Sequence, residues 1–160
     1  MPDACVLGVD LGGTAIKLGL FSLDGELLAE HQRPTPQPAT PGAVCVEIAD
    51  AVSELDPDGK ASVVGIGLPG PMDADARVAR VCINLPGWEE VPLAAWLEPR
   101  LRRKVTLAND GNCALVGEAW KGAAVGCSDV VLLTLGTGVG GGVMLGGRLF
   151  TGHNLSLIHI

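Results

Sequence analysis

Charged and aromatic residues are scarce in this 160-residue sequence, at 18% and 3% of the chain. An average soluble domain carries about 25% charged residues, and disordered chains combine high charge with low hydrophobicity. With 48% hydrophobic residues, this composition excludes disorder. A chain of this length corresponds to one domain, and its core is expected to form without a disulfide or a metal.

An excess of basic residues is also missing. The sequence has 18 Asp and Glu against 11 Lys and Arg, which gives a net charge of −7. This charge repels phosphate backbones, so no nucleic-acid partner is expected. One basic cluster stands out, and we interpret it as the solvated C-terminal end of a helix; it comprises Arg100, Arg102, Arg103 and Lys104.

The cysteines lack any regular spacing. There are five, none of them in a CxxC pair, so the sequence indicates neither a disulfide framework nor a zinc knuckle. The first residues carry neither a basic region nor an apolar run, so no secretory leader is predicted. A reducing, cytoplasmic location is therefore expected.

One uncharged stretch, residues 130–147, reaches the roughly 18-residue length of a membrane-spanning helix. Seven of its residues are glycine, and each glycine costs roughly 1 kcal/mol of helix propensity. We therefore predict a strand, a glycine-rich turn and a second strand there, and no membrane partner.

The usual nucleotide-binding motifs are absent or out of context. Residues 136–141 match GxGxxG, but a strand-like segment follows in place of a helix, and no acidic residue occurs after Asp129. The only Gly-Lys pair, Gly59-Lys60, is followed by Ala61, so there is no Walker A loop. Neither a Rossmann nor a P-loop site is predicted.

Hydrophobic patterning predicts alternating strands and helices. Helices are expected at 42–55, 92–102 and 109–121, and a proline-rich connecting loop at 34–41. Strands are expected at 4–9, 15–21, 27–33, 63–68, 78–82, 105–108, 130–135 and 143–145. Three strands before the first helix, followed by alternation, favour an α/β domain with a mixed sheet and flanking helices.

Two glycine-rich hairpin tips, at 10–14 and 134–142, are candidate phosphate sites because successive backbone N–H groups form concave anion sites. The alternative is that the glycines only close tight turns. Asp110 stands where a strand ends and a helix begins, so it either caps that helix or projects into a cleft. A carboxylate that accepts a hydroxyl proton, two phosphate loops and Mg²⁺ would suffice for phosphoryl transfer.

Five motifs, in order and in spacing across residues 4–154, resemble the ROK family of bacterial sugar kinases, most closely its glucokinases. They are Asp10-Leu-Gly-Gly-Thr14, Gly65-Ile-Gly-Leu-Pro-Gly70, Asn84-Leu-Pro-Gly-Trp88, Asn109-Asp110 and Leu133-Thr-Leu-Gly-Thr-Gly-Val-Gly-Gly-Gly142. The resemblance implies the N-terminal lobe of an actin-like (ribonuclease H-like) ATPase fold. It also implies transfer of the γ-phosphate of ATP to the 6-hydroxyl of a hexose, glucose above all.

The same resemblance implies roles for individual residues. Asp110 would be the catalytic base, and Asp10 would face Mg²⁺ through water unless it is only a turn carboxylate. The sugar pocket would include Gly70, Asn84, Asn109 and Asp110, with Trp88 packed beneath the loop. The phosphates of ATP would meet Gly12, Gly13, Thr14, Gly136, Thr137 and Gly138. Trp96 and Trp120 are interpreted as core residues on helix faces.

Several alternatives stay open. The hexose could be mannose, fructose or an N-acetylated hexosamine, and polyphosphate could replace ATP. The protein could also be a non-catalytic sugar-binding or regulatory member of the family. A homodimer is left open for the full-length protein.

The end of the chain departs from the family pattern. Residues 1–154 are interpreted as the N-terminal kinase lobe, and residues 155–160 as a foreign or frameshifted tail. The family's next sugar-binding Glu, its helical C-terminal lobe and its Cys/His zinc motif would all lie beyond this point, so zinc is left open. We expect the 160-residue chain alone to lack tight ATP binding and turnover, and to expose apolar surface where the second lobe would dock.

Overall fold

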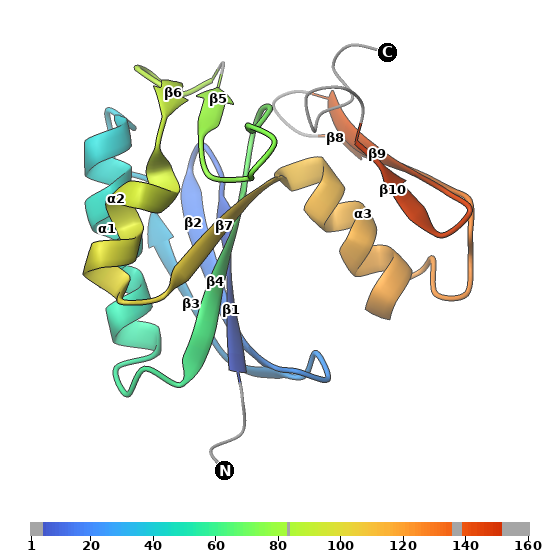
Figure 1. Ribbon diagram of the computed structural model, residues 1–160, viewed down its shortest axis with the longest axis horizontal. Helices are drawn as coiled ribbons and strands as arrows, with labels where there is room; N and C mark the ends of the chain where they lie inside the picture. Colours follow the sequence, from blue (N-terminus) through green and yellow to red (C-terminus); the bar gives the residue numbers. More distant parts are fainter. Residues whose placement is uncertain (1–4, 83, 136–138, 152–160) are drawn as a thin grey trace.

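A five-stranded mixed sheet forms the centre of the protein in a computed structural model, which describes residues 5–82, 84–135 and 139–151 (Figure 1). The strand order is β3-β2-β1-β4-β7, with the first three strands antiparallel and β4 and β7 parallel to β1. The strands are β1 (Cys5–Leu11), β2 (Ala15–Ser22), β3 (Leu27–Pro34), β4 (Ala61–Leu68) and β7 (Lys104–Asn109). The predicted mixed sheet is confirmed.

Two helices, α1 (Pro41–Leu55) and α2 (Leu93–Leu101), cover one face of this sheet (Figure 1). Helix α1 begins one residue before the predicted start, because proline is favoured at the first helical position. Its buried stripe includes Val44, Ile48 and Val52, which pack into the main core with Leu97 of α2. The 3.6-residue spacing of the apolar positions therefore predicted the buried face of α1 correctly.

The third helix, α3 (Asp110–Lys121), packs against a separate sheet instead of the main core. This sheet has the order β10-β9-β8, from β8 (Val130–Leu135), β9 (Val139–Leu145) and β10 (Arg148–Phe150) (Figure 1). Glycines permit the close contact: a Cβ on Gly111 would lie 2.6 Å from the carbonyl oxygen of Gly141. The two strands predicted within residues 130–145 are confirmed, although β9 begins four residues before its predicted start at 143; the predicted turn between them lies outside the described residues.

Some predictions fail because they depend on distant contacts. Trp96 and Trp120 are 39% and 55% exposed instead of buried, and the Trp120 ring lies over the turn at Gly25. Two three-residue strands, β6 (Glu89–Val91) and β10, were not predicted, and β5 (Ala79–Val81) pairs with β6. Strands this short are too brief to show a period-two pattern.

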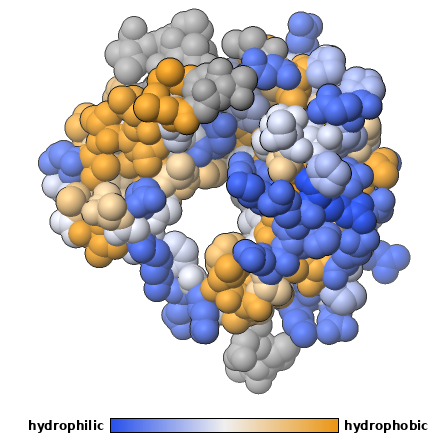
Figure 2. Space-filling view, turned by 180° about the vertical axis from the view of Figure 1, so that it is seen from behind, coloured by the Kyte–Doolittle hydropathy of each residue, from blue (hydrophilic) through white to orange (hydrophobic). Residues whose placement is uncertain are grey.

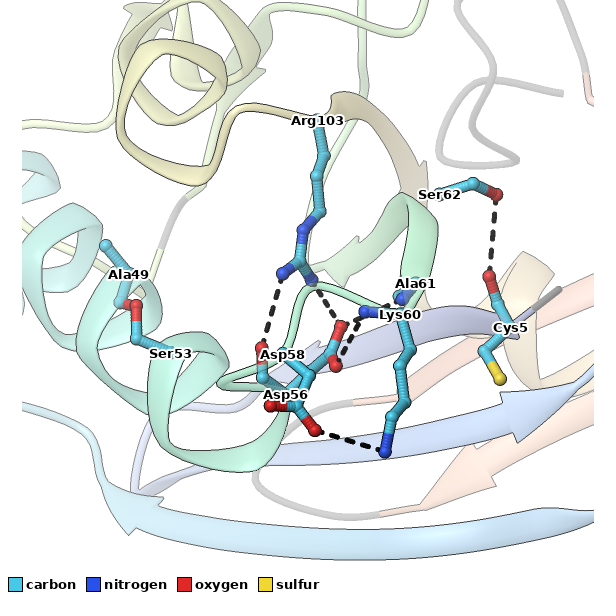
Figure 3. Close-up of polar contacts among 9 residues, drawn as sticks. All are labelled: Cys5, Ala49, Ser53, Asp56, Asp58, Lys60, Ala61, Ser62 and Arg103. Atoms are coloured by element: carbon cyan, nitrogen blue, oxygen red, sulfur yellow. Dashed lines mark hydrogen bonds and ion pairs between the residues drawn. The ribbon is translucent and has the colours of Figure 1, made fainter. Parts of the chain in front are cut away.

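Arg103 is also placed differently from the prediction of a solvated helix end. Its side chain is 12% exposed, and its Nη1 lies 2.8 Å from Oδ2 of Asp56, the residue that ends α1 (Figure 3). Asp56 also accepts backbone N–H bonds from Lys60 and Ala61, each 2.9 Å long. Burial acts to raise the pKa of Asp56, but these donors and the guanidinium outweigh it and hold that pKa below its usual range.

None of the helices within the described ranges combines the length and the apolar character that crossing a bilayer requires. The longest of them, α1, has 15 residues. The prediction that residues 130–147 do not form such a helix is confirmed by β8 and β9.

Candidate active site

The predicted catalytic residues gather at one edge of the central sheet. Strands β1, β4 and β7 are parallel, so their carboxyl ends meet at that edge. In the strand register, Asp10 stands opposite Gly67, and Leu68 stands opposite Asn109, which Asp110 follows. Ligands bind at this edge in open α/β sheets, so the strand topology alone makes it the candidate site.

Asp110 is the first residue of α3, but it does not cap the helix. The cap is Asn109, whose Oδ1 accepts the backbone N–H of Asn112 at 3.1 Å. Asp110 is exposed, and its Oδ1 accepts the N–H of Gly111 at 2.7 Å. Asn109, and not Asp110, therefore caps the helix, so the Asp110 carboxylate is left accessible to a substrate.

Asn109 joins the catalytic edge to the loop that follows β4. Its Nδ2 donates to the carbonyl oxygen of Gly70 at 3.3 Å, so two of the predicted sugar residues are in direct contact. Gly70 has a φ of +108°, and a Cβ there would collide with the carbonyl oxygen of Val81. Only glycine fits this conformation. Asn84 lies exposed in the loop between β5 and β6, and within the described ranges no hydrogen bond joins it to Gly70 or Asn109.

The first predicted phosphate loop is the tip of the β1–β2 hairpin. The N–H of Gly12 bonds to the carbonyl oxygen of Ala15 at 3.0 Å, which closes the turn. Gly13 and Thr14 are exposed at the tip, and a Cβ on Gly13 would meet no atom within 4 Å. A ligand therefore has open access to the backbone of this loop.

The second predicted phosphate loop, Gly136, Thr137 and Gly138, lies outside the described residues. The strands that flank it are described, and Leu135 of β8 pairs with Val139 of β9. Both strands pack against α3, which begins at Asp110. The contact between Gly111 and Gly141 thus brings β9 next to the residue that follows the candidate base.

Asp10 carries an unusual charge environment. It faces Lys17 directly across the β1–β2 pair. Burial raises the pKa of the Asp10 carboxyl, Lys17 partly offsets this effect, and the negative charge of Asp110 raises that pKa further. Two carboxylates that repel each other are suited to a hard divalent cation, since Mg²⁺ binds one or two carboxylates and keeps several waters.

Metal sites built from three or more His, Cys, Asp or Glu side chains are not found among the residues that the structure describes. The question of zinc stays open. The Asp10 carboxylate is the kind of oxygen donor that Mg²⁺ prefers.

A cavity of about 700 Å³ extends from these carboxylates between the central sheet and α3. Figure 2 shows the hollow between the two halves of the molecule. Its lining includes Asp10, Lys17, Asp110 and Cys113, together with glycine backbone from β1, β2 and β4. The Asp10 and Asp110 carboxylates in this lining connect the cavity to the catalytic edge of the sheet.

Sequence reasoning missed Lys17 and Cys113. Lys17 could have been found, because Asp10 and Lys17 are equally far from the Gly13–Thr14 tip and so pair across the hairpin. Burial, followed by the charges of Asp110 and Asp10, raises the pKa of the Cys113 thiol. Burial and the charge of Asp110 likewise raise the pKa of Cys82 to about 12. Both thiols stay protonated, which makes them poor nucleophiles.

Comparisons with known proteins agree with this geometry. A model of the ROK family matches residues 6–156. A glucokinase of Thermotoga maritima is 42% identical over 154 residues, which are 96% of this chain and 49% of that protein. An N-acetyl-D-glucosamine kinase of Vibrio vulnificus is 38% identical over 151 residues, 92% of this chain and 48% of that protein.

A solved structure shows the same fold. The ROK family glucokinase from Streptomyces griseus, crystallised with glucose and AMPPNP, matches with a TM-score of 0.89 at 33% identity, over 96% of this chain and 48% of that one. The expected fold class, the N-terminal lobe of an actin-like ATPase, is confirmed. The chain spans about half the length of the relatives that it matches.

Proposed function

Because the chain belongs to the ROK family, we propose that it forms the lobe of an ATP-dependent hexose kinase that carries the catalytic carboxylate. The observation that carries this proposal is the state of Asp110. Asn109 takes over the helix cap, so Asp110 stays exposed beside Asp10 at the edge where the parallel strands end.

In this proposal Asp110 is the general base. Its carboxylate accepts the proton of the sugar 6-hydroxyl as the hydroxyl oxygen attacks the γ-phosphorus of ATP and ADP leaves. The loop of Gly12, Gly13 and Thr14 binds phosphate oxygens through the backbone N–H groups at its tip, since the N–H of Gly12 itself bonds to Ala15, and Gly136, Thr137 and Gly138 form the second phosphate loop. Asp10 would hold Mg²⁺, which would supply positive charge to stabilise the phosphates.

The sugar is held by neutral groups, which suits an uncharged ligand. Asn109 and Gly70 are joined by a hydrogen bond, and in this proposal Asn84 contributes a further amide from the loop between β5 and β6. Glucose is the proposed substrate, supported by the Thermotoga maritima and Streptomyces griseus relatives. The Vibrio vulnificus relative supports N-acetylglucosamine as the second candidate. Mannose, fructose and a polyphosphate donor are tested in the same assay.

The test uses the protein encoded at the source locus, read through and beyond the codon of Asn154. Asp110→Asn keeps the size of the side chain but removes the base, so kcat for glucose phosphorylation should fall roughly 10²- to 10⁴-fold. Asp50→Asn, on the exposed side of α1, is the matched control and should leave kcat unchanged. Full activity in Asp110→Asn would refute the catalytic role.

Two further outcomes separate the alternatives. Binding of glucose without turnover under any donor would favour the non-catalytic sugar-binding protein. Assaying N-acetylglucosamine, mannose and fructose beside glucose ranks the substrates by kcat/KM.

The 160-residue chain is itself proposed to be inactive. Exposed apolar side chains support this proposal; Val131, Leu133, Leu135 and Val139 of the β8–β9 pair are between 69% and 81% exposed (Figure 2). A patch of this kind marks a surface that a partner covers. ATP-dependent glucose phosphorylation by this chain alone would contradict the proposal.

A further inference from the structure

The segment Thr35–Ala39, which links β3 to α1, contacts both of the loops assigned to substrates. We call it the brace segment. Its residues bond to the first phosphate loop at one end and to the sugar loop, residues 84–88, at the other. The sequence predicts this proline-rich stretch to be a connecting loop, and its composition does not indicate these contacts.

At the phosphate loop, all three tip carbonyls accept hydrogen bonds from the brace segment. The hydroxyl of Thr35 donates to Gly12 at 2.6 Å, and its backbone N–H donates to Thr14 at 3.0 Å. The Nε2 of Gln37 donates to Gly13 at 3.3 Å. Thr35 is only 4% exposed, so water does not compete for its hydroxyl, whereas Gln37 is exposed.

These bonds fix the direction of the opposite groups. A trans peptide is planar, so the N–H of one residue points away from the carbonyl of the residue before it. Because the carbonyls of Gly12, Gly13 and Thr14 face the brace segment, the N–H groups of Gly13, Thr14 and Ala15 face away from it. Successive N–H groups directed to one side are the arrangement that binds an anion.

At the sugar loop, the contact is an indole hydrogen bond. Nε1 of Trp88 donates to the carbonyl oxygen of Ala39 at 2.8 Å, and the two residues are 1% and 3% exposed. The carbonyl oxygen of Trp88 accepts the N–H of Cys82 at 3.1 Å. Trp88 therefore packs beneath the loop that carries Asn84, as predicted, and anchors it to the brace segment.

We propose that the brace segment positions the two substrate loops through separate contacts: Thr35 orients the phosphate loop, and Trp88 of the sugar loop is tied to the brace segment through Ala39. Both are positioning residues, since neither touches a reacting atom. The proposal rests on the proposed function, which assigns ATP to the phosphate loop and the hexose to the sugar loop. It predicts that the two residues affect different substrates.

The test measures KM for ATP and KM for glucose in variants of the protein from the source locus. Thr35→Val removes one hydroxyl and should raise KM for ATP roughly tenfold, with KM for glucose within about twofold of wild type. Trp88→Phe removes the indole N–H and should give the reverse pattern. Thr35→Ser keeps the hydroxyl and should restore KM for ATP.

The matched control is Thr40→Val, five residues further on. Thr40 is exposed, and its side chain makes no capping hydrogen bond to α1. Both KM values should be unchanged. Equal increases of both KM values in Thr35→Val and Trp88→Phe would overturn the proposal, as would failure of Thr35→Ser to restore KM for ATP.

Two additional measurements keep the test decisive. If Thr35→Val is too unstable to assay, Gln37→Leu should raise KM for ATP two- to threefold, and an unchanged KM would overturn the proposal. If wild type lacks kinase activity, the proposed function fails, and inorganic tripolyphosphate replaces ATP in an NMR titration. Shifts of the Gly13, Thr14 and Ala15 amide signals in wild type but not in Thr35→Val would still support the positioning role. Their absence in wild type would refute it.

Discussion

The two faces of the central sheet are built from opposite kinds of residue. On the face toward α1 and α2, strands β1, β2, β4 and β7 carry mainly large aliphatic side chains. One row across the strands runs from Leu18 through Val9 and Ile66 to Leu107, and all four are at most 4% exposed. This face forms the main core.

The middle of the face toward α3 has few large side chains. The row next to the first consists of Gly19, Gly8, Gly65 and Thr106. The row nearest the carboxyl ends consists of Lys17, Asp10, Gly67 and Ala108. With so little to pack, this face borders the cavity of about 700 Å³.

The difference between the two faces means that one stabilises the fold and the other carries the candidate reactive groups. A carboxylate such as Asp10 on the packed face would lose its hydration without compensation, which costs several kcal/mol. On the open face it keeps access to solvent and to Asp110, at the expense of a pKa above its usual range. One sheet thus supports the fold with one face and holds the reactive groups on the other.

The largest loss of stability is expected from a substitution of Ile66 on the packed face, which tests the contrast between the two faces. Ile66→Ala removes three buried carbons from a side chain that is 1% exposed, and should lower the free energy of unfolding by about 4 kcal/mol. Urea denaturation of the 160-residue chain, followed by circular dichroism, measures the change.

Ile66→Val is the graded control, with an expected loss of about 1 kcal/mol. If Ile66→Ala cost no more than Ile66→Val, the packed face would not be the source of stability.

A smaller loss of stability is expected from breaking the ion pair between Asp56 and Arg103 at the end of α1. Asp56→Asn leaves the guanidinium of Arg103 without its carboxylate, and should lower the free energy of unfolding by about 3 kcal/mol at neutral pH. Asp58→Asn, which disrupts an exposed pair with Lys60, should change it little. The same urea titrations give both values.

The stabilising contribution of Asp56 should depend on pH. The pKa of Asp56 is lower in the folded chain than its unfolded value of about 3.9, so its contribution is fully present above that value. It is lost as the pH falls through the folded pKa. The difference between wild type and Asp56→Asn should therefore shrink below about pH 4. A difference that stays constant from pH 7 to pH 3 would contradict the lowered pKa.

How much the sequence could predict depends on the distance over which a contact acts. Apolar runs and helical spacing located β1, β4 and α1 to within two residues, because these elements follow local periodicity. The ion pair between Asp56 and Arg103 joins residues 47 apart, and no local pattern indicates it. The same reason explains why β8 and β9, though predicted as strands, were not predicted to form a separate sheet.

The candidate site likewise contains residues that the sequence could identify and contacts that only the fold shows. Asp10 and Asp110 could be selected because each follows a predicted strand, whereas Gly70 was selected only through the resemblance to the ROK family. The role of Asn109 as helix cap depends on side-chain geometry at one junction, so sequence alone left the cap and the base unresolved. The contact between Trp88 and Ala39 spans 49 residues and became visible only in the fold.

The smallest effect tests the open face directly. Gly65 lines the cavity, its φ is not positive, and a Cβ there would meet no atom within 4 Å. Gly65→Ala should therefore raise the free energy of unfolding by about 0.5 kcal/mol, because alanine has less conformational freedom to lose on folding. Gly19→Ala is the matched control in the same row: its Cβ would lie 2.5 Å from Cε2 of Phe21, so the ring must move and stability should fall. Urea midpoints for the two variants should move in opposite directions. A loss at Gly65 as large as that at Gly19 would mean that this face is packed after all, and the contrast between the two faces would fail.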